Sequence, residues 1–231
     1  MEAFAKDTDG FFARHFDRKI SGAISRQLLK TPITPNQITI FVTVLGIGSG
    51  WLMAQPGYGT KVAGSLIFLL TSILDGCDGE VARAKKMTSK IGGWLDLWGD
   101  NVVHIAFFYG LGVGLLRDTD KVIYLKLGWA AVWGTLLSAT LASYQMRRKG
   151  QSSFTSVSGD NEDPAAAPAW RRMLIKASDA LARRDFVYGV VVLALVNQLS
   201  WFLWACALGS LIYACVLGVL CLFTRPSGLP R

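Results

Sequence analysis

Charged residues are scarce in this sequence. Asp, Glu, Lys and Arg make up only 17% of the 231 residues, against about 25% in an average soluble domain. Hydrophobic residues make up 52%. A soluble domain of this length has no core large enough for so much apolar surface, whereas a lipid bilayer accommodates it. The composition therefore argues against a soluble domain and favours a membrane protein.

Cysteine and histidine are also rare. The two histidines, His15 and His104, stand alone, and no P-loop or Gly-x-Ser-x-Gly motif occurs. No Cys-x-x-Cys pair occurs, which argues against a zinc site or a disulfide framework. The cysteines are Cys77, Cys206, Cys215 and Cys221.

Positive charge is in excess, with a formal net charge of +8. Such a balance suits nucleic acid, anionic lipid headgroups or phosphorylated substrates. Basic and aromatic residues are not interleaved in the way that is typical of RNA-binding surfaces. We therefore expect lipid and phosphorylated partners and no nucleic acid.

Apolar stretches long enough for membrane helices fill most of the chain. A bilayer core needs roughly 20 apolar residues in a helix, and only the fifth stretch is clearly short. The polar residues Asn197, Gln198 and Ser200 separate it from the sixth, although a four-helix arrangement would fuse or drop this last pair. We predict an all-α polytopic membrane protein with six transmembrane helices at about 38–54, 61–83, 91–116, 122–146, 185–198 and 200–223.

Lys and Arg predict the orientation of these helices. With the N-terminus inside, the inner segments contain 20 basic residues and the outer ones four, as expected for cytoplasmic loops. Both termini would then be cytosolic, and the polar start makes a signal peptide unexpected. We divide the chain into a cytosolic or interfacial segment 1–36, a membrane domain 37–224 with a cytosolic loop at about 147–184, and a tail 225–231.

Residues 1–36 contain an amphipathic pattern. On a helix, Phe12, Phe16 and Lys19 or Ile20 would share one face. A helix of this kind suits the headgroup plane of a bilayer. We therefore predict an N-terminal interfacial helix, with a solvated basic tail as the alternative.

Four aspartates lie near the cytosolic ends of the second and third predicted spans. Asp75 and Asp78 are three residues apart, and Asp96 and Asp100 are four apart, so each pair lies on one helix face. The connecting loop is short, so we expect the two helices to be antiparallel neighbours. All four carboxylates would then converge inside the bundle.

Such a cluster of carboxylates favours divalent cations. Without cations the like charges would repel one another, and some would take up protons. Oxygen-only ligands suit Mg²⁺, Mn²⁺ or Ca²⁺, and a pair of metals suits displacement at phosphorus. The alternatives are a structural role for the acids or an ion-coupled transporter, although ionisable residues inside membranes are usually functional.

The same residues spell a known signature. Asp75-x-x-Asp78-Gly79-x-x-Ala82-Arg83, followed after eight residues by Gly92-x-x-x-Asp96-x-x-x-Asp100, resembles the motif of the CDP-alcohol phosphotransferase family at every fixed position. Pro35-Asn36-x-x-Thr39 resembles the start of that family's first span. The six-span organisation is similar too, so the likeness extends over most of the chain.

The resemblance implies a reaction and roles for residues. Metal ligands would be Asp75, Asp78 and Asp96, with Asp100 sharing the site and acting as the general base for the acceptor hydroxyl. The cofactor would be Mg²⁺ or Mn²⁺, with two ions bound. The acceptor would attack the β-phosphorus of a CDP-linked donor, and CMP would leave. The CDP pocket would be formed by Asn36, Thr39, Asp78, Gly79, Ala82, Arg83 and Gly92.

The acceptor is less closely defined. Arg147 and Arg184 lie at the cytosolic ends of the fourth and fifth spans, where family members that use inositol phosphate bind the acceptor phosphate. Ordinary positive-inside anchoring is the alternative for these arginines. The N-terminal region resembles the branch that makes inositol-phosphate products, which include di-myo-inositol phosphate phosphate and phosphatidylinositol phosphate. The donor would be CDP-diacylglycerol or CDP-inositol.

Rival functions remain open at this point. Within the family, the alternative is synthesis of phosphatidylglycerol phosphate. Membrane prenyltransferases also use helical Asp pairs with Mg²⁺, but without the linking Gly-x-x-Ala-Arg, and an ion-coupled transporter is the alternative outside enzymology. The resemblance further implies a homodimer in a bacterial or archaeal cytoplasmic membrane. His104 follows Asp100 by one helical turn, and we expect it to pack rather than react.

Overall fold

Helices form the regular structure of this protein, for which we use a computed structural model that describes residues 16–149, 170, 172–175, 178 and 185–223. No strand occurs in this part of the chain. The all-α prediction is therefore confirmed for the described residues. The helices are α1 (Arg18–Leu28), α2 (Pro35–Ala54), α3 (Tyr58–Ala84), α4 (Lys90–Thr119), α5 (Ile123–Lys149), α7 (Phe186–Leu195) and α8 (Leu199–Phe223).

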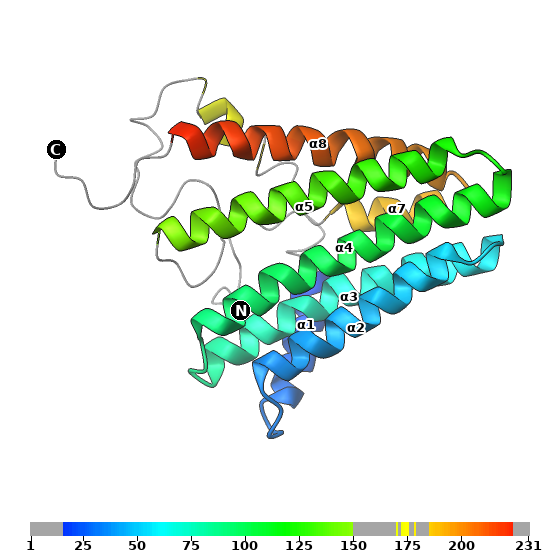
Figure 1. The fold of residues 1–231 in the computed structure, drawn as a ribbon. Coiled ribbons are helices and arrows are strands. Elements are labelled where there is room, and N and C mark those ends of the chain that lie inside the picture. Colours follow the sequence, from blue (N-terminus) through cyan, green and yellow to red (C-terminus); the bar gives the residue numbers. More distant parts are fainter. Residues whose placement is uncertain (1–15, 150–169, 171, 176–177, 179–184, 224–231) are drawn as a thin grey trace.

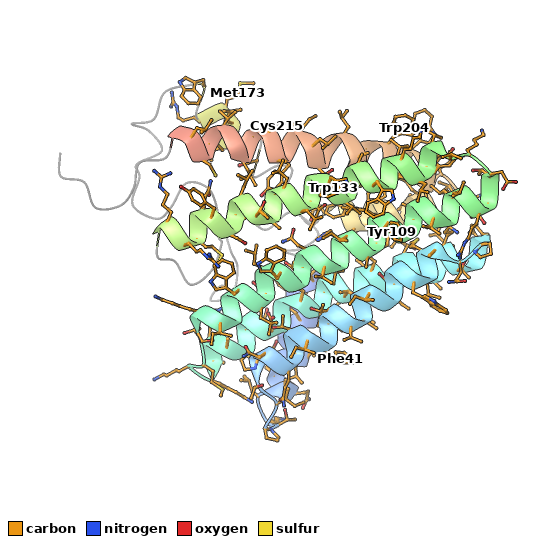
Figure 2. The ribbon with its side chains drawn as sticks, in the orientation of Figure 1. Phe41, Tyr109, Trp133, Met173, Trp204 and Cys215 are labelled. Carbon is orange, nitrogen blue, oxygen red and sulfur yellow. The ribbon has the colours of Figure 1, made fainter. Side chains whose placement is uncertain are left out.

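Five of these helices are long and apolar enough to cross a membrane: α2, α3, α4, α5 and α8. Their outer faces carry large apolar side chains, among them the exposed Phe41, Trp133 and Trp204, which are labelled in Figure 2. Soluble proteins rarely expose so much apolar surface. The bundle is thus built as an integral membrane protein.

The fifth predicted span differs from the sequence prediction. We expected a helix over 185–198, but α7 has only 10 residues, a length of about 15 Å at 1.5 Å per residue. That is half the thickness of a bilayer core of about 30 Å. Val196 and Asn197 form a turn that ends α7, with Asn197 at a positive φ of 56°. Six spans are therefore not established.

Helix α2 packs closely against both α3 and α4. A side chain at Gly110 of α4 would place its Cβ 2.0 Å from the carbonyl oxygen of Gly50 in α2, so the two backbones touch. Small residues allow such close packing between membrane helices. The backbones of α3 and α4, in contrast, rarely approach each other. Helices α3 and α4, which we expected to be antiparallel neighbours, therefore have their closest backbone contacts with α2.

Aromatic side chains fill the space between α3 and α4 away from the carboxylates. Phe68 of α3 stacks on Phe107 of α4, with ring centroids 4.1 Å apart and an angle of 23° between the planes. Phe186 of α7 and Phe202 of α8 stack in the same core. These rings keep the backbones of α3 and α4 apart. At the end of the bundle where α3 ends and α4 begins, side chains can therefore meet between the two helices.

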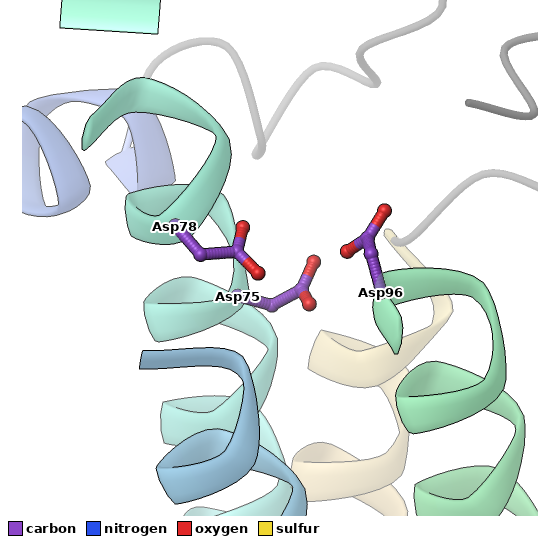
Figure 3. Close-up of side chains that lie close together, drawn as sticks. All are labelled: Asp75, Asp78 and Asp96. Carbon is purple, nitrogen blue, oxygen red and sulfur yellow. The ribbon is translucent and has the colours of Figure 1, made fainter. Parts of the chain in front are cut away.

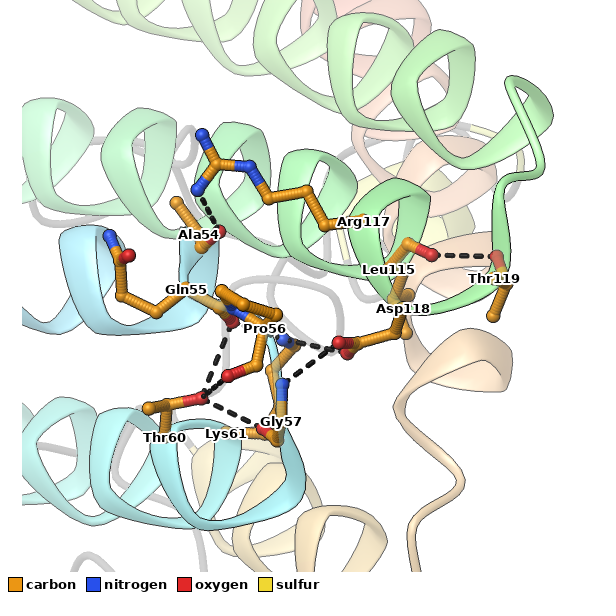
Figure 4. Close-up of polar contacts among 10 residues, drawn as sticks. All are labelled: Ala54, Gln55, Pro56, Gly57, Thr60, Lys61, Leu115, Arg117, Asp118 and Thr119. Atoms are coloured by element: carbon orange, nitrogen blue, oxygen red, sulfur yellow. Dashed lines mark hydrogen bonds and ion pairs between the residues drawn. The ribbon is translucent and has the colours of Figure 1, made fainter.

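The start of α2, the end of α3 and the start of α4 lie at the same end of the bundle (Figure 1). At the opposite end, a cluster of polar contacts connects the α2–α3 turn to the last turn of α4 (Figure 4). The Lys61 ammonium is 3% exposed, lies 2.9 Å from Asp118 Oδ2 and donates to the Gln55 carbonyl oxygen at 2.6 Å. The other carboxylate oxygen of Asp118 accepts from the backbone N–H of Gly57 at 2.8 Å. This cluster fixes the α2–α3 turn to the end of α4.

Helix α1 lies within the segment for which we predicted an interfacial helix. Phe12 is outside the described residues, while Phe16 and Ile20 are exposed. The opposite face of α1 packs on α3 through the small buried side chains of Ser21 and Ser25. Contact of α1 with a membrane surface stays a prediction.

Candidate metal centre

Three aspartates meet at the inner end of the bundle (Figure 3). Asp75 and Asp78 come from the last turns of α3, and Asp96 comes from the second turn of α4. One carboxylate oxygen from each lies within 4.8 Å of the others. Asp75 and Asp78 are only 9% and 7% exposed. The convergence predicted from the two helix spacings is present for these three side chains.

Helix α2 contributes a hydroxyl group to this cluster. Thr39 Oγ1 donates a hydrogen bond to Asp78 Oδ2, and the second carboxylate oxygen of Asp78 accepts from the N–H of Gly79. Thr39 is buried and also contacts the carbonyl oxygen of Pro35, 3.2 Å away. Hydrogen bonds to an ionised carboxylate favour its charged form and fix its orientation. Thr39, which the sequence placed in the CDP pocket, thus directly touches a predicted metal ligand.

The first turns of α2 and α4 meet beside the cluster. The Gln37 side chain accepts from the backbone N–H of Thr34 at 2.9 Å, and Ser89 Oγ accepts from the N–H of Gly92 at 3.0 Å, so both helix starts are capped. A Cβ at Gly92 would lie 3.2 Å from Asn36 Oδ1. The structure therefore brings together Asn36 and Gly92, two residues predicted to line the same pocket.

The rest of the signature lies along the end of α3. A Cβ at Gly79 would lie 3.3 Å from an Arg83 guanidinium nitrogen, so this side chain folds back over the glycine one turn earlier. Arg83 is exposed and Ala82 is half-buried. Their part in a CDP pocket stays a prediction.

Asp100 is not a member of the three-carboxylate group. It follows Asp96 by one turn of α4 and is half-buried. Its backbone carbonyl oxygen accepts from His104 Nδ1 at 2.7 Å, and the His104 ring packs against Phe68 and Phe186 with centroids 5.8 and 6.0 Å away. His104 therefore packs in the aromatic core, as expected. The role of Asp100 stays a prediction.

Of the two arginines predicted for the acceptor phosphate, the structure describes one. The Arg147 guanidinium lies 5.1 Å from the centroid of the Trp94 ring, a cation–π contact between α5 and α4. Trp94 precedes Asp96 by two residues, so Arg147 contacts α4 at the level of the cluster but on a different face of the helix. Arg184 lies outside the described residues.

Sequence reasoning missed one acidic group in this region. Glu80 is 3% exposed and accepts hydrogen bonds from Ser21 Oγ at 2.9 Å and from an Arg18 guanidinium nitrogen at 3.3 Å. It lies in the unconstrained part of the signature, between Gly79 and Ala82, so the motif gave no reason to select it. Its position in an apolar helix was the available signal, because buried acids need partners.

The residues present fit a divalent cation. The three carboxylates offer oxygen donors only, which suit Mg²⁺ or Mn²⁺ better than the softer zinc or copper. Three carboxylates so close together, of which Asp75 and Asp78 are buried and Asp96 is half-buried, also need a compensating positive charge. The cysteines are free thiols, of which Cys77 and Cys221 are buried and Cys215 is exposed.

A family model described as CDP-alcohol phosphatidyltransferase matches residues 32–212, which is most of the chain. Curated relatives agree with this match. The chain is 37% identical over 129 residues to a bifunctional IPC transferase and DIPP synthase of Aquifex aeolicus, covering 56% of this chain and 28% of the relative. It is 29% identical over 128 residues to the archaetidylinositol phosphate synthase of Pyrococcus horikoshii, covering 54% and 60%. It thus spans less than two thirds of each relative.

A solved structure shares the fold. The phosphatidylinositol phosphate synthase of Mycobacterium tuberculosis, crystallised with CDP-DAG bound, superposes with a TM-score of 0.60 at 18% identity, covering 92% of this chain and 98% of that one. Identity this low establishes the likeness of the fold alone. The same arrangement of helices therefore occurs in a protein that holds a CDP-linked lipid.

Proposed function

Because the chain belongs to the CDP-alcohol phosphatidyltransferase family, we propose that it transfers a substituted phosphate group from a CDP-alcohol to an alcohol acceptor and releases CMP. The observation that supports this most directly is the meeting of Asp75, Asp78 and Asp96 at the inner end of α3 and α4. These are three of the four aspartates in the signature. A buried site with oxygen ligands suits a diphosphate–metal complex.

The chemistry is a displacement at the β-phosphorus of the donor. The acceptor oxygen forms a bond to this phosphorus as the bond to the α-phosphate oxygen breaks, and CMP leaves with the bonding electrons. Asp75, Asp78 and Asp96 would hold Mg²⁺ or Mn²⁺, and we propose two ions, with Asp100 completing the ligand set. Bound there, the cations supply positive charge that stabilises the diphosphate oxygens and the leaving CMP.

We assign the proton transfer to Asp100. Its carboxylate would accept the proton of the attacking hydroxyl, which needs a base within hydrogen-bond reach. Asp100 lies one turn deeper in the bundle than Asp96, and its backbone carbonyl oxygen is fixed by His104 Nδ1.

The CDP moiety would bind where α2, α3 and α4 begin or end. Asn36, Thr39, Asp78, Gly79, Ala82, Arg83 and Gly92 would form this pocket. The contact of Thr39 with Asp78, and the 3.2 Å separation between Asn36 Oδ1 and a Cβ placed at Gly92, support it. Arg83 is exposed, so its guanidinium is accessible to a phosphate or to the nucleotide. A nucleotide leaving group would depart to the cytosol from this end.

We propose inositol phosphate as the acceptor, and CDP-diacylglycerol or CDP-inositol as the donor. Relatives named for archaetidylinositol phosphate and phosphatidylinositol phosphate synthesis support this choice. Arg147, stacked on Trp94 two residues before Asp96, supports it from the structure. A guanidinium held over a ring by a cation–π contact still has N–H donors that can bind a phosphate. Arg184 would join it.

The arrangement in the membrane completes this proposal. Residues 37–224 would form a six-span domain, with 1–36 at the cytosolic interface and 225–231 a cytosolic tail. The positive-inside distribution of charge supports cytosolic termini. We further propose a homodimer in a bacterial or archaeal cytoplasmic membrane, with the site open to the cytosol.

CMP release by purified protein in detergent tests the function. Each donor is combined with inositol phosphate, glycerol phosphate and free inositol, with and without EDTA. We expect metal-dependent CMP release that is fastest with inositol phosphate. Preference for glycerol phosphate would instead indicate phosphatidylglycerol phosphate synthesis. Absence of CMP release with every pair would refute the proposal.

A further inference from the structure

The buried Glu80 carboxylate links α3 to α1. Its partners, Arg18 and Ser21, both belong to α1, and Ser21 is itself buried. The Ser21 carbonyl oxygen also lies 3.6 Å from the thiol of Cys77, which neighbours Asp78 in the chain. A buried carboxylate is strongly destabilising without a compensating charge. Arg18 supplies that charge at 3.3 Å.

The residue before Arg18 makes a second connection. Asp17 accepts a hydrogen bond from the hydroxyl group of Tyr188, which lies in the first turn of α7. Helix α7 packs mainly against α3. Two consecutive residues at the start of α1 therefore bind two different helices of the inner end.

The other end of α1 is fastened to α3 as well. Lys85 follows the last residue of α3, and its ammonium group donates to the carbonyl oxygens of Thr31 and Ile33, each at 2.8 Å. Thr31 and Ile33 lie in the segment that joins α1 to α2. Helix α1 is thus attached at both ends along the stretch of α3 that contains Asp75 and Asp78.

We propose that two neighbouring residues at the start of α1 are positioning residues: Arg18 for the metal centre, through Glu80, and Asp17 for the start of α7, through Tyr188. Together with Ser21 they form what we name the α1 brace, which fixes the aspartate-bearing end of α3 and the start of α7. Glu80 follows Asp78 by two residues, a rotation of about 200° around the helix. Arg18 therefore neutralises an acid on the opposite side from the metal ligands and leaves their negative charge for cations. The activity readout below rests on the proposed function; the binding readout does not.

Mn²⁺ binding to purified protein, followed by the electron paramagnetic resonance of the free ion, tests the brace. We compare Arg18→Met, Glu80→Gln and the double variant, with Arg26→Met as the control, because Arg26 is an exposed arginine of the same helix. Arg18→Met should weaken Mn²⁺ binding by roughly tenfold, as loss of a supporting partner does at metal sites. The double variant should recover to within about threefold of wild type, because the uncompensated acid is gone and the Ser21 hydroxyl can still donate to the amide oxygen that replaces the carboxylate, which keeps α1 attached to α3.

Several outcomes decide the proposal. Wild-type Mn²⁺ binding by Arg18→Met overturns it, as does a double variant no better than Arg18→Met. If Arg18→Met fails to fold, Ser21→Ala removes one of the two hydrogen bonds to Glu80 and should weaken Mn²⁺ binding severalfold; unchanged binding then refutes the brace.

The Tyr188 contact has its own test. Tyr188→Phe should lower kcat for CMP release severalfold while Mn²⁺ binding stays at the wild-type level, and unchanged kcat refutes the role of Asp17. Absence of CMP release from wild type, with the Mn²⁺ results as expected, would refute the proposed function and leave the Arg18–Glu80 part of the brace standing. If the wild-type protein releases CMP and Arg18→Met binds Mn²⁺ as well as the wild type, the Arg18–Glu80 part of the brace is refuted and the proposed function stands.

Discussion

Replacing Thr39 by valine tests whether α2 helps to build the metal centre. Valine has the shape of threonine but lacks the hydroxyl group that donates to Asp78 Oδ2. Thr39 is buried, so little water is present to replace the lost donor. A hydrogen bond to a charged group contributes about 1.5–3 kcal/mol, which corresponds to roughly 10- to 150-fold in an equilibrium constant.

We expect the full effect to appear in metal affinity, because partners that orient ligands typically contribute 10- to 100-fold there. Thr39→Val should therefore require at least about tenfold more Mn²⁺ or Mg²⁺ for half-maximal CMP release. Thr39→Ser retains the hydroxyl group and should stay within about threefold of wild type, a shift of about 0.7 kcal/mol at most. The assay is a metal titration of CMP release at saturating donor and acceptor.

Thr43→Val is the matched control. Thr43 lies one turn further along α2, and its hydroxyl group donates to the Thr39 carbonyl oxygen at 2.8 Å rather than to a carboxylate. This variant should titrate like wild type. Equal metal requirements for Thr39→Val and Thr43→Val would contradict the reasoning, because the contact with Asp78 would then have no bearing on metal binding.

Other substitutions test the remaining parts of the site. Asp100→Asn should abolish turnover, by 10²-fold or more as expected for loss of a general base, while CDP-donor binding persists; substantial turnover would remove Asp100 from that role. Asp96→Asn should lose metal-dependent activity, and full activity of the wild type in EDTA would refute the metal scheme. Arg147→Ala should raise KM for inositol phosphate by roughly tenfold, the equivalent of about 1.4 kcal/mol, and leave KM for free inositol unchanged. Asp118→Ala leaves Lys61 buried without its ion pair and should lower the free energy of unfolding by up to about 3 kcal/mol, seen as a lower Tm in detergent; wild-type Mn²⁺ binding by the folded fraction is expected, since this cluster lies at the far end of the bundle.

Helix content was predictable because each membrane helix must satisfy its own backbone hydrogen bonds within a long apolar stretch. Five of the six predicted stretches correspond to helices of spanning length. The fifth corresponds to the shorter helix α7, which ends at Leu195 just before the polar Asn197 and Gln198, so a sixth span is not established. A short apolar stretch can equally be a helix that packs on neighbours, as α7 does on α3.

Helix periodicity also predicted the carboxylate faces. Spacings of three and four residues place side chains on one face whatever the helix packs against. The sequence could not show that the backbones of α3 and α4 each pack closely on α2 and meet one another through side chains, because this depends on close contacts such as that between Gly50 and Gly110. The sequence also could not predict that Asp96 joins Asp75 and Asp78 while Asp100, one turn further along α4, does not. This depends on how α4 is placed relative to α3.

Contacts between distant parts of the chain belong to the tertiary structure. The sequence by itself determined the membrane helices, the paired aspartates and the family, because periodicity, composition and motif spacing are local properties. Only the folded chain placed Thr39 on Asp78, Arg147 on Trp94 and Arg18 on Glu80. Each of these pairs lies 39 or more residues apart, so its geometry depends on how whole helices pack, which local patterns do not encode.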